Sequence, residues 1–142
     1  MIATYFVDTN VLIYAGSNAA EDRAKRQTAR ELLSRPGVTF SAQVLQEFYV
    51  VAVTRNRLKI TPNEALAVLQ SLAAFPICPI SRDLVLDAID DSQRFQISYW
   101  DAAILAAARH MGCSTVYSED LSAGQIYNGV TVINPFSPSP TS

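Results

Sequence analysis

The chain has 142 residues, of which 49% are hydrophobic and 17% are charged. This length suits one globular domain with a substantial buried core. It contains no run near the ~18 apolar residues of a membrane span, and its start lacks the basic region of a secretory signal. We therefore predict one cytoplasmic domain over residues 1–136 with no membrane partner, followed by a loose Pro/Ser-rich tail over residues 137–142.

The formal net charge of −2 argues at first against a nucleic-acid partner, because phosphate-binding proteins usually carry a basic surface. The charges are segregated, however. Residues 1–59 hold eight Lys/Arg and five Asp/Glu, whereas residues 60–142 hold three and eight. The basic residues of the first part form two groups, namely Arg23, Lys25, Arg26, Arg30 and Arg35, then Arg55, Arg57 and Lys59. They are a candidate phosphate-binding surface, and solvated helix faces are the alternative.

In chain order, the first half predicts a buried strand, one or two helical turns, a charged helix, a short strand and a longer helix. These elements span residues 2–7, 11–15, 21–34, 38–40 and 42–57. The first strand is apolar and rich in β-branched residues, and the last helix has apolar residues at helical spacing. Ser41 is its predicted N-cap.

The second half continues with alternating helices and strands. We predict helices over residues 62–74, 82–94 and 99–110, strands over 76–80, 115–117 and 130–133, and a short turn or helix over 121–128. Thr61, Pro62 and Glu64 form a strong helix start, with an N-cap, a proline at the first helical position and an acid three residues after the cap. Ser81 and Ser98 are the predicted N-caps of the next two helices.

Strands separated by helices need crossover connections, which favour a parallel sheet with helices on both faces. We predict an α/β fold with three layers, α/β/α, around a central parallel sheet of about five short strands. Ligands gather beyond the carboxyl ends of such strands. Asp8 follows the first strand directly, Asp120 follows the fourth after two residues, and Asp101 lies in the first turn of a helix. These three carboxylates are therefore expected to meet at one edge of the sheet.

Glu47 is a fourth candidate acid. It lies nearly two turns into its helix, beside the apolar residues Val44, Phe48 and Val51. We expect it at the edge of a buried face, where an acid without a partner is costly. The alternative is a partly exposed acid that pairs with Arg55.

Two of these assignments have further alternatives. Ser98 with an acid three residues later is itself a capping box, so Asp101 has a structural role that is compatible with a functional one. Glu119 competes with Asp120 as the acid after the fourth strand, and spacing alone leaves the two nearly even.

Several ionised carboxylates in one pocket repel one another, so the pocket must bind protons or cations. A divalent cation is the simpler answer, and all-oxygen ligands suit Mg²⁺ or Mn²⁺ rather than zinc. Such ions lower the pKa of a bound water, hold a phosphate oxygen and stabilise a leaving alkoxide, which predicts phosphodiester hydrolysis. Thr9, Asn10 and Ser118 are candidate hydrogen-bond partners of the carboxylates, with ordinary turn chemistry as the alternative.

Other site chemistries find little support. Cys78 and Cys113 have apolar neighbours and no CxxC spacing, so we predict buried free thiols rather than a zinc site or a disulfide framework. His110, the only histidine, falls at a helix C-terminus, where capping explains it.

Four segments in order resemble the PIN-domain family and, more narrowly, the VapC-like toxin ribonucleases of prokaryotic toxin–antitoxin pairs. They are FVDTNVLIYA, SAQVLQEFYVV, SYWDAAILAAA and VYSEDLSAGQIYNGVTVINPF, and the match extends over nearly the whole chain. The resemblance puts the family's acidic positions on Asp8, Glu47, Asp101 and Asp120. Asn10 follows the first acid as in the family's D-T-N start, and Ser118 stands where threonine is frequent.

The resemblance implies an Mg²⁺- or Mn²⁺-dependent endoribonuclease acting on single-stranded RNA, a homodimer, and a cognate antitoxin whose C-terminal segment covers the groove. It also favours Asp120 over Glu119. The alternatives are a PIN-like RNA- or protein-binding module without catalysis, or an RNA-processing nuclease that is not a toxin. A haloacid-dehalogenase-like phosphatase is disfavoured because it needs a second Asp where Asn10 stands, and a receiver domain because it needs an acidic pair after the first strand.

Overall fold

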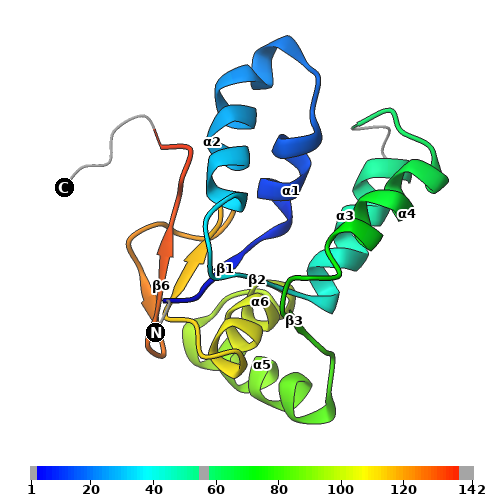
Figure 1. Cartoon of the computed structure of the whole chain (residues 1–142). Coiled ribbons are helices and arrows are strands. Elements are labelled where there is room, and N and C mark those ends of the chain that lie inside the picture. The colour runs from blue at the N-terminus through cyan, green and yellow to red at the C-terminus, as the bar shows by residue number, and fades with distance from the viewer. Residues whose placement is uncertain (1–2, 55–57, 138–142) are drawn as a thin grey trace.

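A six-stranded sheet forms the centre of the protein (Figure 1). The computed structural model describes residues 3–54 and 58–137. The strand order is β3-β2-β1-β4-β6-β5, and every neighbouring pair is parallel except β5 and β6. The strands are β1 (Tyr5–Val7), β2 (Val38–Ser41), β3 (Ile77–Cys78), β4 (Thr115–Tyr117), β5 (Ile126–Tyr127) and β6 (Val130–Ile133).

Helices flank this sheet. They are α1 (Thr9–Gly16), α2 (Arg23–Leu33), α3 (Ala42–Thr54), α4 (Pro62–Ser71), α5 (Arg82–Phe95) and α6 (Tyr99–His110), with a 3₁₀ turn at Ala20–Asp22. In Figure 1, the α1/α2 pair lies above the central strands and the α5/α6 pair below them, while α3 and α4 run side by side at the right. The predicted α/β fold, with a mostly parallel central sheet between helices, is confirmed.

The core surrounds the central strands, with α6 packed closely against them and α1, α2 and α3 also contributing buried apolar residues. Phe6, Phe40, Val116 and Val132 are fully buried in the sheet. All seven residues of α6 from Ala102 to Ala108 are buried, and five of them are alanine. Small side chains let this helix pack closely on β2, β3, β4 and β6, so its N-terminus is held firmly at the edge of the sheet.

The predicted helix starts at Ser41, Thr61, Ser81 and Ser98 are confirmed. Each side-chain oxygen accepts a bond from the backbone N–H three residues later, and Thr61 with Glu64 completes a capping box. Each bond satisfies an N–H that the helix cannot pair internally. Helix α1 begins at Thr9, two residues before its predicted start, because Asp8 serves as its N-cap.

The segment 121–128 contains a turn at Ala123 and Gly124, as expected, but its end forms a strand that was not predicted. Ile126 and Tyr127 form β5, which pairs antiparallel with β6 through a tight turn at Asn128 and Gly129. Both turn residues have positive φ, 51° and 85°, which Asn-Gly adopts readily in a two-residue hairpin. The sheet therefore has one strand more than predicted, and that strand is antiparallel.

Other predicted boundaries shift by a few residues. β3 is limited to Ile77–Cys78, whereas 76–80 was the expected range, since Pro76 and Pro79 on either side cannot donate to a ladder. Helix α4 ends at Ser71 rather than at residue 74. The first strand begins at Tyr5 rather than at residue 2, since Ala3 and Thr4 are not part of a strand and Ile2 lies outside the described residues. The end of the predicted helix 42–57 and nearly all of the predicted tail also lie outside the described residues.

Cys78 and Cys113 are free and buried, as predicted. His110 lies in the last turn of α6, with its Nε2 2.6 Å from Asp87 Oδ2. Within residues 3–54 and 58–137, no helix is both long and apolar enough to cross a membrane.

Candidate active site

A cavity of about 400 Å³ opens at the carboxyl ends of the central strands. Its walls come from α1, α3, the start of α6 and the segment after β4. The lining residues are Asp8, Thr9, Asn10, Ile13, Tyr14, Gln43, Glu47, Val51, Trp100, Asp101, Ile104 and Asp120. The structure thus brings all four predicted acids to one cavity, and none of the lining residues is Lys or Arg.

Asp8 is the most enclosed of the four acids, with 6% of its surface exposed. It stands between β1 and α1, so the strand fixes its backbone and the helix start orients its side chain. Oδ1 accepts from the Thr9 N–H at 2.7 Å, and Oδ2 accepts from the Ser118 hydroxyl at 2.7 Å. Burial raises the pKa of Asp8 to about 6; the two hydrogen bonds oppose this, and the charges of Asp120 and Glu47 add to it.

Glu47 faces Asp8 from α3. Its Oε1 accepts from the Thr9 hydroxyl at 3.0 Å. Burial raises its pKa, hydrogen bonds from Thr9 and Gln43 lower it, and the charges of Asp101 and Asp120 raise it. Its carboxylate is therefore held inside the acidic cluster; the alternative partner, Arg55, lies outside the described residues.

Asp101 enters the cavity from the N-terminus of α6. Its backbone N–H donates to Ser98 Oγ at 3.1 Å, which is one half of the capping box considered above. Among the described residues, the reciprocal bond from Ser98 N–H to the Asp101 carboxylate is not formed. Its side chain is therefore left facing the cavity, at the positive end of the α6 dipole.

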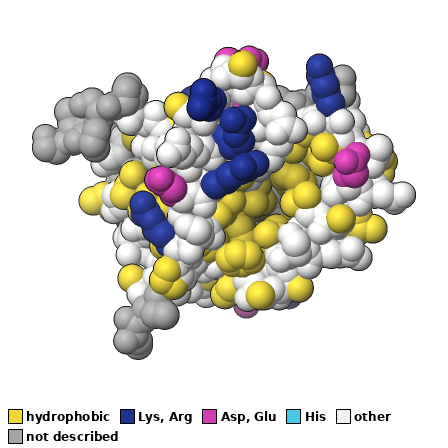
Figure 2. All heavy atoms as spheres, turned by 45° about the horizontal axis from the view of Figure 1, so that its top comes forward, with side chains coloured by type: hydrophobic (Ala, Val, Ile, Leu, Met, Phe, Trp, Pro, Cys, Tyr) yellow, Lys and Arg dark blue, Asp and Glu magenta, His cyan; other side chains and the backbone are white. Residues whose placement is uncertain are grey.

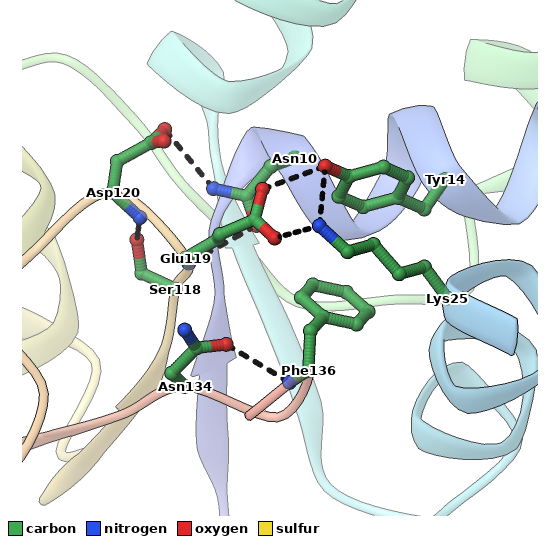
Figure 3. Close-up of polar contacts among 8 residues, drawn as sticks. All are labelled: Asn10, Tyr14, Lys25, Ser118, Glu119, Asp120, Asn134 and Phe136. Carbon is green, nitrogen blue, oxygen red and sulfur yellow. Dashed lines mark hydrogen bonds and ion pairs between the residues drawn. The ribbon is translucent and has the colours of Figure 1, made fainter. Parts of the chain in front are cut away.

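Glu119 and Asp120 point to different places (Figure 3). Asp120 lines the cavity, and its Oδ2 accepts from Asn10 Nδ2 at 3.1 Å. Glu119 turns toward α1 and α2, where it accepts from the Tyr14 hydroxyl of α1 at 2.6 Å and pairs with Lys25 Nζ of α2 at 2.5 Å. The charge of Glu119 is thus matched by a lysine, while that of Asp120 belongs to the acidic cluster.

Thr9, Asn10 and Ser118 all bond to cavity acids. Thr9 serves two of them, through its N–H to Asp8 and its hydroxyl to Glu47. The fully buried Ser118 donates to Asp8 and accepts from the Asp120 N–H at 3.1 Å. These bonds tie β1, α3 and the segment after β4 into one framework around the carboxylates.

The donor set fits a hard divalent cation that keeps some of its water. All four acids offer oxygen, the ligand atom preferred by Mg²⁺ and Mn²⁺. Within residues 3–54 and 58–137, however, no three acidic, histidine or cysteine side chains form a ready-made ligand group. An ion here would complete its shell with water or substrate oxygens, as Mg²⁺ commonly does.

Two residues of the site framework were not anticipated from the sequence. Gln43, one turn before Glu47 on α3, donates from Nε2 to the Trp100 carbonyl at 3.2 Å. Lys25 bridges Glu119 and the Tyr14 hydroxyl, and its Nζ lies 4.8 Å from the Tyr14 ring centroid. The spacing of Gln43 before Glu47 was a usable signal, whereas no local pattern links Lys25 to Glu119.

Part of the predicted basic surface has internal partners. Arg26 donates to the Ser17 carbonyl at 3.0 Å and Arg30 to the Ala15 carbonyl at 2.9 Å, so both help to hold the end of α1. Together with Arg23 they line a shallow hollow on α2. Figure 2 shows one face of the molecule, on which Lys and Arg side chains lie beside a hollow lined by hydrophobic side chains.

A family model described as the PIN domain matches residues 5–127. The chain therefore belongs to the PIN-domain family, as its sequence motifs predict. The matched range contains all four cavity acids and every strand except β6. No relative is found among curated proteins.

Solved structures of toxin–antitoxin proteins share the fold. The crystal structure of VapC20 from Mycobacterium tuberculosis, described as a sarcin-ricin-loop-cleaving toxin, is 26% identical with a TM-score of 0.66, over 82% of this chain and 90% of that one. A toxin–antitoxin complex from Klebsiella pneumoniae is 21% identical with a TM-score of 0.64, over 94% and 98%. A DNA-bound VapBC from Salmonella typhimurium is 16% identical with a TM-score of 0.62, over 92% and 97%. The fold is that of VapC-like proteins.

The different environments of Glu119 and Asp120 lead to a testable contrast. Glu119→Gln is expected to keep RNA cleavage within about threefold of wild type and to lower the free energy of unfolding by roughly 1 kcal/mol or less, because the Lys25 pair is partly exposed. Asp120→Asn is expected to remove cleavage. Parallel cleavage assays and urea unfolding measure both effects; the reverse order of activities would place Glu119 in the site.

Proposed function

We propose that this protein is a divalent-metal-dependent endoribonuclease and the toxin of a toxin–antitoxin pair. The observation that carries the proposal is the meeting of Asp8, Glu47, Asp101 and Asp120 in one cavity without a lysine or arginine in its lining. Such a group of carboxylates is costly to assemble unless a cation offsets its charge. Membership of a nuclease family and the VapC-like fold support the same function.

Asp8, Asp101 and Asp120, together with Glu47, are the residues that would hold the metal ion or ions. A bound Mg²⁺ or Mn²⁺ supplies an activated water and stabilises charge on the phosphate and the leaving oxygen. The protein's contribution is orientation. The hydroxyls of Thr9 and Ser118 and the amide of Asn10 fix the carboxylate oxygens, so little rearrangement is needed when the cation and phosphate arrive.

An acidic protein needs a way to attract RNA. A cation held by the cavity carboxylates would offset their charge, and basic residues away from the cavity lining supply the long-range attraction to phosphates. Arg23 on α2 is part of such a surface, and Arg26 and Arg30 carry positive charge there even while they hold α1. The substrate is accordingly RNA whose backbone approaches along the α2 side.

The partners that we propose are a cognate antitoxin and a second copy of the chain. Toxin–antitoxin complexes among the solved structures of this fold support the first of these partners. Exposed apolar side chains on α3 and α4, among them Val50 and Leu66 at 46% and 49% exposure, offer surface for protein contacts. The proposed site of action is the cytoplasm, where RNA and antitoxin are both present.

The test is cleavage of total RNA by the purified protein with Mg²⁺ or Mn²⁺ and with EDTA. Cleavage with either metal and none in EDTA is the expected result, with product ends mapped by sequencing to identify the target. Metal binding is measured separately, because added Mg²⁺ should raise the melting temperature of the protein. A folded, antitoxin-free protein that neither binds the metal nor cleaves RNA would contradict the proposal and favour a binding module.

A further inference from the structure

Trp100 is an exposed aromatic side chain on the lining of the acidic cavity. It is 64% exposed and is the only tryptophan of the chain. Tryptophan has a large apolar ring that proteins usually bury for most of its area. The protein leaves this ring in water directly beside Asp101, which is unfavourable unless a ligand covers it.

The position of Trp100 is fixed by its surroundings. It lies in the first turn of α6, whose next seven residues after Asp101 are all buried. Its carbonyl accepts from Nε2 of Gln43, itself only 7% exposed, at 3.2 Å. The Tyr99 ring packs edge-on against the indole, with centroids 5.0 Å apart and planes at 81°. The ring is thus presented from a rigid helix start.

A nucleotide in the cavity has two parts with different needs. Its phosphate belongs with the carboxylates and their cation, and its base projects away from the backbone and needs a surface to stack on. Unpaired bases stack on aromatic side chains, and the contact tolerates any base because each has a π face. Trp100 offers such an aromatic face one residue from Asp101. The side chains of Gln43 and Glu47, which line the same cavity, do not.

We propose that Trp100 is a stacking platform for an unpaired base next to the cleaved phosphate, so that the substrate is single-stranded at that point. This inference rests on the proposed nuclease function and adds a recognition contact to it. A protein partner is the less favoured occupant, because half of the residues that line the cavity are acids or amides, and charged residues are depleted from the centres of protein interfaces.

The emission of Trp100 reports the contact directly, because no other tryptophan contributes. Wild-type protein is titrated with a mixed-sequence single-stranded RNA octamer in Ca²⁺, and the oligonucleotide is checked for integrity afterwards. The matched ligand is an octamer of equal charge with abasic sites at its centre. Saturable quenching by the first octamer and much weaker quenching by the abasic one are expected; equal quenching, or none at saturation, would overturn the proposal.

Variants then measure the size of the contact by anisotropy of a labelled octamer. Trp100→Ala is expected to weaken binding roughly 5- to 150-fold, with Trp100→Phe between it and wild type. Ile126→Ala is the matched control, because Ile126 is 65% exposed but lies outside the cavity, and it should bind like wild type. Melting temperatures verify that each variant is folded.

Two other results would reject the stacking role in distinct ways. If concentrating the RNA-free protein shifts the emission toward that of a buried indole, Trp100 is covered by a second copy of the chain. If Trp100→Ala cleaves and binds RNA like wild type, the proposed nuclease function is retained and the stacking role of Trp100 is rejected. If the normal octamer quenches the emission much more than the abasic one, but the protein never cleaves RNA, the stacking platform is supported and the proposed catalysis is rejected.

Discussion

Asp101→Asn is expected to reduce metal-dependent RNA cleavage by at least about 100-fold while the protein remains folded. Loss of an outer partner of a metal ligand commonly costs 10- to 100-fold, and loss of a ligand itself should cost no less. The fold should tolerate the change because Ser98 caps α6 through the backbone N–H of residue 101, which asparagine retains. The measurement is the initial cleavage rate with saturating Mn²⁺ and the melting temperature in EDTA.

Asp83→Asn is a matched control for this variant. Asp83 also lies in the first turn of a helix with a serine N-cap, Ser81 on α5, but it is exposed and does not line the cavity. Both substitutions remove one negative charge near a helix N-terminus, which costs about 0.3–1 kcal/mol in stability. Equal activity in the two variants would show that the carboxylate of Asp101 acts only at the helix terminus.

The order of helices and strands, and hence the parallel sheet, was predictable from patterns among residues close together in the sequence. Apolar strands that alternate with capped helices require right-handed crossovers and hence a parallel sheet. The caps at Thr61, Ser81 and Ser98 were readable because each is a local bond between a side chain and the backbone three residues on. β5 was missed although Asn128-Gly129 is a strong hairpin signal, since its two residues carry too little pattern for a strand.

The acidic cavity was predictable for a related reason. In a parallel sheet, residues that follow the strands meet at one edge whatever their separation in sequence, which places Asp8 beside Asp120. The choice between Glu119 and Asp120 was not readable from spacing. It depends on Lys25, 94 residues away, and on Tyr14, and such a tertiary contact leaves no periodic trace in the sequence.

The exposure of Trp100 could not be predicted from the sequence either. An aromatic residue at a helix start beside an apolar run would ordinarily be expected in the core. It stays outside because it lies two residues before the buried stretch of α6, and its neighbour Asp101 faces the cavity. The departure from the expected pattern falls at the site, where function outweighs burial.

Asp8→Asn is expected to abolish cleavage and yet stabilise the metal-free protein at neutral pH. The pKa of Asp8 is raised from 3.8 to about 6 in the folded protein, mainly by burial, so the folded state binds the proton more tightly than the unfolded chain. The contribution of Asp8 to the free energy of unfolding therefore falls as pH rises from about 4 to about 6 and levels off above that. A shift of this size corresponds to about 3 kcal/mol at the plateau.

Asparagine carries no charge to desolvate, so the variant escapes this cost. In EDTA at pH 7.5 its free energy of unfolding should exceed that of wild type by roughly 1–3 kcal/mol, less the value of a weakened bond to Ser118. At pH 4 the two proteins should be nearly equal. Added Mg²⁺ should stabilise wild type much more than the variant. Urea unfolding at both pH values tests this, with Asp83→Asn, which removes an exposed carboxylate outside the cavity, as the control. A variant less stable than wild type at pH 7.5 in EDTA would mean that the Asp8 carboxylate holds the fold together through its hydrogen bonds, and that the acidic cluster is not under strain before the cation binds.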